Sequence, residues 1–342
     1  MATGLCVTLM DVHDAAARIC GHVRTTPLLE SPLLDDLLGF RLLLKAESLQ
    51  YTGSFKARGA FNQVLQLTGE EMAEGIVAFS SGNHAQGVAY AASRVSVPTT
   101  ILMPHDAPKL KMRNTQTYGA EIVTYNRETE DRYVVGERLV RERGGRLIHS
   151  YEDPRTIAGQ GTVGLEIFKQ ARELCAQPDA IVVNCCGGGL ASGIAVTLDL
   201  YENRPGLFTA EPQGFDDARL SLATGEIFKN ERTTGSICDA LLMPSVGLNN
   251  FRILRHHKAR GLAASDEDVM AAMSIAHEHF GLVLEPSGAV GLACTILNRA
   301  AFQHQTAVVV ASGGNVDPER YADMLIRGRM IQDRLLTPFP RA

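Results

Sequence analysis

The stretch AIVVNCCGGGLASGIAVTLDL, residues 180–200, decides the fold of this chain. It opens with apolar and β-branched residues, passes through the glycine run 187–189, and continues with residues at helical spacing. A buried strand that turns through glycines into a helix is typical of a parallel sheet in an α/β protein. The turn presents the unpaired N–H groups of a helix N-terminus, which suit a phosphate. The stretch therefore predicts an α/β fold with an anion site at this corner.

Two other interpretations of the glycine corner stay open from the residues alone. The corner can be a tight turn that holds no ligand. It can also be the dinucleotide-binding corner of an oxidoreductase, because Gly187-x-Gly189-x-x-Ser192 departs from G-x-G-x-x-G only at the third glycine. Glu211 would then be the ribose-binding acid. That interpretation leaves the other motifs of the chain unexplained.

Apolar strands alternate with longer helical stretches along most of the chain. Strands are expected at 41–47, 75–80, 99–104, 121–126, 180–185, 207–212 and 307–312. Helices are expected at 56–67, 84–95, 108–118, 130–143, 161–175, 190–202 and 266–280. Such alternation predicts parallel sheets with helices on both faces.

The composition describes an ordinary globular protein of 342 residues, 45% hydrophobic and 21% charged. The net charge of −5 and the scattered basic residues argue against nucleic-acid binding. No apolar run approaches the roughly 20 residues that span a bilayer, and the N-terminus lacks the features of a signal peptide, so we expect no membrane contact. The seven cysteines form no C-x-x-C pair, which argues against structural zinc and indicates the reducing cytoplasm.

Three further segments carry residues suited to chemistry. In SLQYTGSFKARGA (48–60), Lys56 follows Phe55 at a helix start, and desolvation there would favour the neutral, nucleophilic amine. In FSSGNHAQGVAYAA (79–92), hydroxyl and amide groups crowd a helix N-terminus, where they could hold a carboxylate. In AVVVASGGNVD (307–317), Ser312 ends a buried strand and could bond a ring nitrogen. Taken singly, these features also fit a surface lysine, an N-cap and a turn serine.

Together and in this order, the four segments resemble the fold-type II pyridoxal-5'-phosphate (PLP) enzymes, specifically the serine/threonine dehydratase (threonine ammonia-lyase) and serine racemase family. The resemblance covers roughly residues 20–320. It implies a fold like that of tryptophan synthase β, with two open, twisted, mostly parallel sheets. It also implies a large PLP-binding domain (1–66 and 152–325), a small mobile domain that closes over substrate (67–151) and a C-terminal helix and tail (326–342).

The resemblance assigns cofactor contacts to Lys56, Phe55, Asn83, Gly187, Gly188, Gly189 and Ser312. Lys56 resembles the Schiff-base lysine that removes the α-proton, and Phe55 the residue beside the cofactor ring. Asn83 resembles the partner of the 3'-oxygen, the glycines the phosphate cradle, and Ser312 the partner of the pyridine nitrogen. The family's phosphate loop usually has four glycines, and Cys186 stands at the first position, where a negative φ would tolerate its Cβ.

The resemblance also implies the substrate contacts and the reaction. Ser80, Asn83 and His84 match the region that grips the α-carboxylate, and Ser81 matches the serine on the opposite face in racemases. The expected activity is dehydration and deamination of L-threonine or L-serine to 2-oxobutanoate or pyruvate plus ammonia. The alternatives are a 3-hydroxyaspartate dehydratase or a serine racemase. The family suggests homodimers.

Two features bear on substrate and metal. Arg132 matches an arginine that serine racemases and hydroxyaspartate dehydratases share, and it could bind a second carboxylate; equally, it could pair with Glu128 on an exposed helix. The segment EPQGFDD (211–217) resembles a divalent-cation site formed by Glu211, Asp217 and the carbonyl of Phe215, suited to Mg²⁺ or another hard cation. The simpler interpretation is an acidic loop without an ion.

Overall fold

The computed structural model describes residues 4–80, 82–107, 109–126, 129–201 and 203–336. In this part of the chain the strands form a six-stranded and a four-stranded sheet. The large sheet contains, in spatial order, β1 (Leu28–Glu30), β2 (Arg41–Lys45), β10 (Thr306–Val310), β7 (Ala180–Asn184), β8 (Gly206–Pro212) and β9 (Arg260–Ala264). Only the short β1 pairs antiparallel with its neighbour among these strands. The small sheet contains β5 (Glu121–Tyr125), β4 (Thr99–Pro104), β3 (Ile76–Phe79) and β6 (Arg146–Leu147), all parallel.

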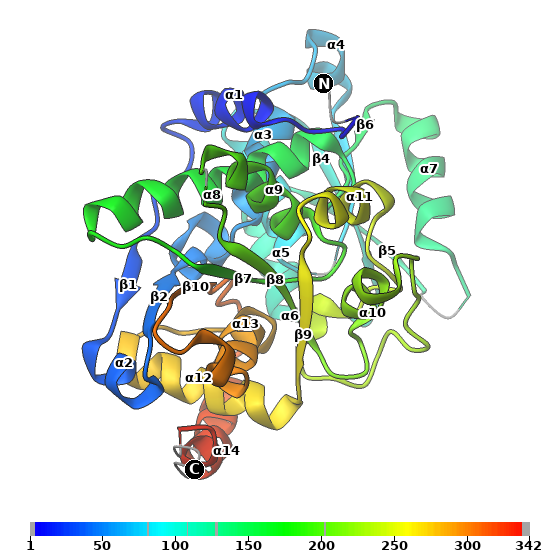
Figure 1. The fold of residues 1–342 in the computed structure, drawn as a ribbon. Helices are drawn as coiled ribbons and strands as arrows, with labels where there is room; N and C mark the ends of the chain where they lie inside the picture. The colour runs from blue at the N-terminus through cyan, green and yellow to red at the C-terminus, as the bar shows by residue number, and fades with distance from the viewer. Residues whose placement is uncertain (1–3, 81, 108, 127–128, 202, 337–342) are drawn as a thin grey trace.

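Helices cover both faces of the large sheet (Figure 1). Successive residues of β7 point to opposite faces, as in any strand. Ile181 and Val183 pack into a core with helices α1, α8, α9 and α11, whereas Val182 packs with α12 and α13. The helices are α1 (Leu9–Ile19), α2 (Pro32–Leu38), α3 (Lys56–Val64), α4 (Gly69–Glu74), α5 (Asn83–Ser93), α6 (Lys109–Thr117), α7 (Arg132–Arg143), α8 (Pro154–Glu173), α9 (Gly189–Thr197), α10 (Asp217–Thr224), α11 (Leu248–His256), α12 (Asp266–Phe280), α13 (Pro286–Leu297) and α14 (Pro318–Leu336).

The small sheet is covered in the same way. Buried residues of β3 and β4, among them Ala78 and Ile101, form one core with α3 and α5. Val77 and Leu102 point to the other face, against Val135 of α7. The expected α/β fold, with two mostly parallel sheets and helices on both faces, is confirmed.

The element bounds differ from the sequence expectation where local signals compete. Helix α8 begins seven residues earlier than expected, because Pro154 occupies its first turn and the Asp153 carboxylate accepts a hydrogen bond from the N–H of Arg155. Strands β1, β6 and β9 were not expected, since the first two are very short and β9 (RGLAA) lacks β-branched residues. The boundary expected at residue 325 falls within α14.

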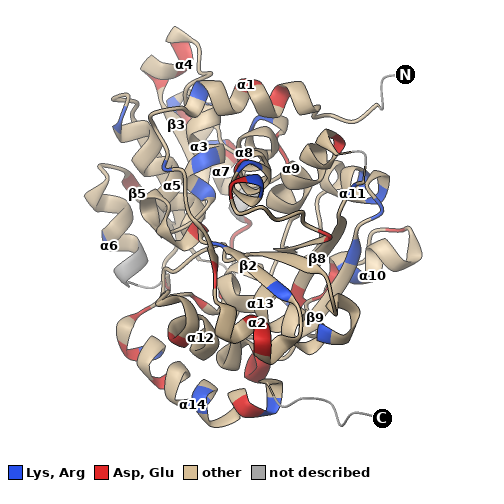
Figure 2. Cartoon of the chain, turned by 60° about the vertical axis from the view of Figure 1, so that its left-hand side comes forward, with Lys and Arg blue, Asp and Glu red and all other residues tan. Residues whose placement is uncertain are grey.

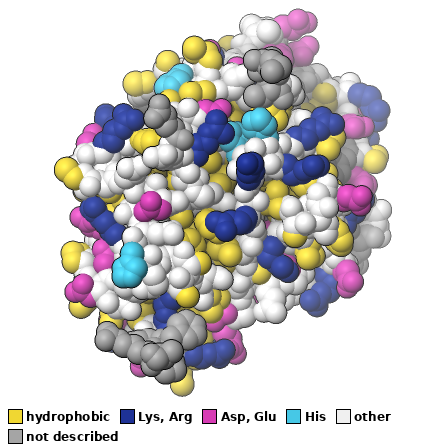
Figure 3. Space-filling view, in the orientation of Figure 1, with side chains coloured by type: hydrophobic (Ala, Val, Ile, Leu, Met, Phe, Trp, Pro, Cys, Tyr) yellow, Lys and Arg dark blue, Asp and Glu magenta, His cyan; other side chains and the backbone are white. Residues whose placement is uncertain are grey.

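Figure 2 shows acidic and basic residues on elements throughout the fold. On the face drawn in Figure 3, both kinds of charged side chain lie among apolar and other polar ones. Among the described residues, no helix combines the length and apolar character needed to cross a membrane.

A cluster of four buried or nearly buried charges joins β2 and α8 to α3. The Arg58 guanidinium donates to both carboxylate oxygens of Glu47, at 2.8 and 2.7 Å, and to both of Glu166 in α8, at 2.7 and 2.8 Å. Lys45, the last residue of β2, donates to Glu166 at 2.6 Å. Burial opposes ionisation of Glu47, but the Arg58 charge outweighs it and holds the pKa of this carboxyl below its usual value. Each cation of the cluster therefore has a carboxylate partner.

Glu47→Gln should destabilise the protein by about 3 kcal/mol at neutral pH, because it leaves a buried guanidinium without one of its two carboxylates. The stability that Glu47 contributes is present above its unfolded pKa of about 4.3 and is lost as pH falls through the lower folded pKa. The difference between variant and wild type should therefore shrink in acid, as measured by thermal unfolding across pH. Glu30→Gln, which removes the half-exposed pair with Arg41, should change stability by less than about 0.5 kcal/mol. Equal effects of the two variants would contradict the role given to the cluster.

Candidate active site

Lys56 opens helix α3, and its side chain is partly buried. Its Nζ donates to the carbonyl oxygen of Ser150 at 3.0 Å and lies 4.9 Å from the centre of the Phe55 ring. Burial lowers the pKa of this amine to about 8, so a substantial neutral fraction exists near physiological pH. A buried amine with a lowered pKa is suited to attack a carbonyl carbon and to accept a proton.

The segment that precedes α8 connects Lys56 to the glycine corner. Ser150 accepts from Lys56, and the next residue, Tyr151, packs its ring against the corner, where a Cβ at Gly187 would lie 2.4 Å from ring carbons. Asn250 of α11 donates to the carbonyls of both Tyr151 and Gly187, at 3.0 and 2.7 Å. These contacts bring together two motifs that lie about 130 residues apart in the sequence.

The glycine corner links β7 to α9 as expected. Gly188 has a φ of 94°, a left-handed conformation that favours glycine, and a Cβ there would lie 2.8 Å from the Cβ of Asn250. The first N–H groups of α9 have no partners within the helix. Cys186 is not among the described residues with positive φ, so its Cβ is tolerated in the backbone. Burial raises the pKa of the Cys186 thiol to about 11, and the thiol remains protonated beside Lys56.

Ser312 follows β10 and lies next to the lysine loop and the end of β7. Its carbonyl accepts from the N–H of Phe55 at 3.2 Å, and its Oγ accepts from Nδ2 of Asn184 at 2.9 Å. Residues 54 and 313 form an isolated β-bridge. The structure therefore places Phe55, Lys56, Ser312 and the strand that leads to the glycine corner together.

Asn83 begins helix α5 and reaches the same region from the small sheet. Its Nδ2 donates to Glu285 at 2.5 Å, and its Oδ1 accepts from Asn315 at 2.8 Å. Asn315 also donates to the carbonyl of Thr52 at 2.7 Å. Asn83 thus connects α5 to the loop after β10 and to the lysine loop.

Two further predicted substrate residues, Ser80 and His84, lie at or near the start of α5. Ser80 Oγ accepts from the N–H of Gly82 at 3.1 Å. His84 is buried with Nε2 3.3 Å from the carbonyl oxygen of Ile148, and burial, reinforced by the Lys56 charge, lowers its pKa to about 3. Its imidazole is therefore neutral. Ser81 lies outside the described residues, as does the side chain of Arg132, whose backbone begins α7.

The two acids predicted to bind a cation lie close together at the carboxyl end of β8. Glu211 accepts from the N–H groups of Ala218 and Arg219, and Asp217 accepts from Asn230 and from the N–H of Val246. Burial and the charge of Asp217 raise the pKa of Glu211 well above its usual value. Burial raises the pKa of Asp217 to about 7. Both carboxyl groups are therefore costly to ionise. Among the described residues, no three His, Cys, Asp or Glu side chains gather into a group that could hold a metal ion.

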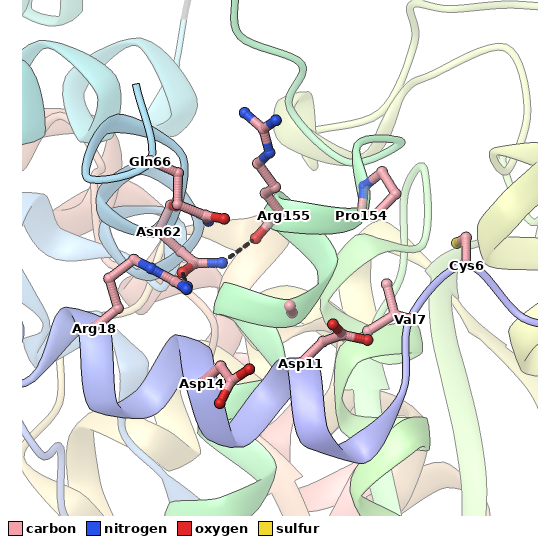
Figure 4. Close-up of a pocket in the computed structure, with 10 residues that line it drawn as sticks. Cys6, Val7, Asp11, Asp14, Arg18, Asn62, Gln66, Pro154 and Arg155 are labelled. Carbon is pink, nitrogen blue, oxygen red and sulfur yellow. Dashed lines mark hydrogen bonds between the residues drawn. The ribbon is translucent and has the colours of Figure 1, made fainter. Parts of the chain in front are cut away.

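A pocket of about 100 Å³ lies elsewhere, where α1, α3 and α8 meet. Figure 4 shows Asn62 of α3 between Arg18 of α1 and the carbonyl of Arg155 in α8, to which it donates at 2.7 Å. Lys56 and the glycine corner are not among its lining residues. At this pocket, the hydrogen bonds of Asn62 connect α3 to α1 and α8. The pocket does not belong to the site around Lys56.

Several residues of the site were not singled out from the sequence. They are Asn184, Ser150, Tyr151, Asn250, Glu285 and Asn315. Asn184 and Asn315 lie within two of the segments singled out above. A polar residue at the end of an apolar strand could have identified Asn184, because buried polar groups need hydrogen-bond partners. Ser150 contributes its main-chain carbonyl, and the Asn250 side chain donates to main-chain carbonyls that are distant in the sequence. No local sequence pattern predicts such contacts.

These residues fit PLP. The glycine corner begins a helix whose first N–H groups suit a phosphate. The desolvated amine of Lys56 lies near Cys186 of this corner, and the Ser312 hydroxyl lies at the neighbouring strand end. The corner, the amine and the hydroxyl match the phosphate, the aldehyde carbon and the ring nitrogen of that cofactor.

Comparison with known proteins supports the same cofactor. A family model described as pyridoxal-phosphate dependent enzyme matches residues 19–313. The chain is 39% identical over 318 residues to the L-threo-3-hydroxyaspartate ammonia-lyase of Saccharomyces cerevisiae, covering 93% of this chain and 96% of the relative. The fold is similar to that of a threonine deaminase from T.th., with a TM-score of 0.86, 41% identity and coverage of 91% and 99%. It is also similar to maize serine racemase, with a TM-score of 0.87, 33% identity and coverage of 95% and 98%.

The dinucleotide-binding interpretation of the glycine corner is therefore replaced. With Lys56, the glycine corner and Ser312 in one site and relatives matched over nearly their whole length, the chain belongs to the fold-type II pyridoxal-phosphate-dependent enzymes.

Proposed function

We propose that this chain is a PLP-dependent ammonia-lyase that converts a small β-hydroxy amino acid into a keto acid and ammonia. The observation that carries the proposal is the Lys56 amine, whose pKa desolvation lowers to about 8 and which the Ser150–Tyr151 segment connects to the glycine corner. The relatives named ammonia-lyase and deaminase support this reaction type.

Each residue has a defined task in this proposal. The N–H groups of the glycine corner and of α9 bind the phosphate, and the Ser312 hydroxyl contacts the ring nitrogen. Nζ of Lys56 accepts the α-proton of the substrate. PLP bound in this site would supply the electron sink for the pair left on the α-carbon. The β-hydroxyl group would take up a proton and leave as water, and hydrolysis of the dehydrated product would give the keto acid and ammonia. The start of α5, with Ser80, Asn83 and the neutral His84, binds the α-carboxylate through hydrogen bonds.

The Saccharomyces relative makes 3-hydroxyaspartate the first substrate to test, ahead of threonine and serine. The assay measures keto acid and ammonia with L- and D-serine, threonine, 3-hydroxyaspartate and phenylserine. Chiral analysis of remaining serine would reveal racemisation, the activity named for the maize neighbour. No keto acid from any of these compounds would contradict the proposal.

We further propose that the protein is cytoplasmic and a homodimer. All seven cysteines are free thiols, which supports a reducing compartment. The dimer rests on the family resemblance.

Lys56→Ala should abolish the near-violet absorbance of bound cofactor and lower kcat by at least about 10³-fold, because the variant lacks the amine that bonds the cofactor and moves the proton. Absorbance spectra and steady-state assays measure both effects. Lys169→Ala, which removes an exposed lysine of α8, should retain both properties. Full turnover in Lys56→Ala would sink the assignment.

Arg132→Ala should lower kcat/KM for 3-hydroxyaspartate by about 10²-fold or more, because a guanidinium at the start of α7 would bind the second carboxylate of this substrate. Turnover of threonine, which has a methyl group there, should change far less. Arg141→Ala on the same helix is the control. Equal losses for both substrates, or none for either, would remove Arg132 from the substrate site.

We also propose that Glu211, Asp217 and the carbonyl of Phe215 bind Mg²⁺ or another hard divalent cation. Two buried carboxyl groups with raised pKa values support the site, because a bound cation would stabilise their ionised forms. Exhaustive EDTA treatment should lower the melting temperature, and added Mg²⁺ or Ca²⁺ should restore it. Asp217→Asn should remove this response. A melting temperature that EDTA leaves unchanged would exclude the cation.

A further inference from the structure

Asn184 is the last residue of β7, and its buried side chain lies between Ser312, which follows the neighbouring β10, and helix α13. Its Nδ2 donates to the carbonyl oxygen of Gly288 and to Oγ of Ser312, both at 2.9 Å. Its Oδ1 accepts from the N–H of Gly291 at 2.6 Å. Both N–H bonds and the carbonyl of this amide are therefore occupied.

The backbone of α13 determines which way the amide faces. The N–H of Gly291 can only donate and the carbonyl of Gly288 can only accept, so Oδ1 must face Gly291 and Nδ2 must face Gly288. In a reversed amide, the NH₂ group would face the N–H of Gly291 and the amide oxygen would face the carbonyl of Gly288, so neither pair could form a hydrogen bond. The close approach requires glycine at 291, since a Cβ there would lie 2.6 Å from Oδ1.

This orientation determines the role of the Ser312 hydroxyl. Because Asn184 donates to Oγ, the hydroxyl proton of Ser312 points to a different acceptor. If the amide instead presented its oxygen, Ser312 would donate to Asn184 and turn its lone pairs toward the cofactor. Lone pairs at this position would favour a protonated ring nitrogen, whereas a donated proton favours the unprotonated form.

We propose that Asn184 is a positioning residue that makes Ser312 a hydrogen-bond donor to the pyridine nitrogen of PLP and so keeps this nitrogen unprotonated. The inference rests on the proposed function, in which Ser312 meets the ring nitrogen. A ring with an unprotonated nitrogen is less electron-withdrawing, so it stabilises a carbanion at the reacting carbon less well. Prompt loss of the β-substituent is then favoured over reactions that need a long-lived carbanion. Asn184 thus selects among reactions without contacting the substrate.

The test is the ¹⁵N resonance of PLP labelled at its ring nitrogen and bound to the protein without substrate. In wild-type protein the resonance should lie at the position of a neutral, hydrogen-bonded pyridine nitrogen. In Asn184→Asp the carboxylate accepts the Ser312 proton. The ring nitrogen must then take up a proton or lose its hydrogen bond, and either change shifts its resonance. Asn298→Asp, the same change at the other end of α13, should leave the resonance in place.

Three results would overturn the proposal: a protonated ring nitrogen in the wild type, an unchanged resonance in Asn184→Asp, or an equal shift in Asn298→Asp. If Asn184→Asp does not fold, Asn184→Ala decides. This variant lacks the group that donates to Ser312, so the ¹⁵N resonance of the ring nitrogen should shift, by less than in Asn184→Asp. An unchanged resonance would contradict the role of Asn184. Because no substrate is present, a neutral nitrogen in a protein without turnover would count against the proposed function alone.

Discussion

The position of Lys56 depends on a guanidinium that has no access to water. Arg58, two residues along α3, is bonded to Glu47 from the segment after β2 and to Glu166 from α8. A buried cation is tolerated only where carboxylates surround it in good geometry, so the three elements must meet in one arrangement. Asn62, further along α3, donates a hydrogen bond to the carbonyl of Arg155 and so also holds α3 against α8. The amine at the start of α3 is thereby held before any cofactor or substrate binds.

Parallel sheets explain why distant motifs converge around this amine. The glycine corner and Ser312 follow β7 and β10, which are neighbours with the same direction, so their carboxyl ends lie side by side. Asn83 follows β3 of the small sheet and reaches the loop after β10 through Asn315. The site therefore draws on elements of both sheets.

Polar groups at strand ends give this common fold its specific chemistry. A strand end buried against a helix must satisfy every donor and acceptor that it carries. Asn184 does so with two backbone groups of α13, and its remaining N–H faces Ser312. The same requirement at β8 gives Glu211 and Asp217 main-chain donors, while burial raises the pKa of both carboxyl groups.

The sequence by itself determined the α/β class, most of the strands and the segments that meet around Lys56, because each of these is a local pattern. The glycine run before α9, Lys56 at the start of α3 and Ser312 at the end of β10 are visible as patterns within a dozen residues. The sequence does not predict β1 and β6, because strands of three and two residues are too short to show the alternation typical of a strand. Only the tertiary structure decided that Ser150 accepts from Lys56, that Tyr151 closes the glycine corner and that Asn184 orients Ser312. These contacts join residues about 35 to 130 positions apart, and their geometry depends on how helices pack on the sheets, which no single segment encodes.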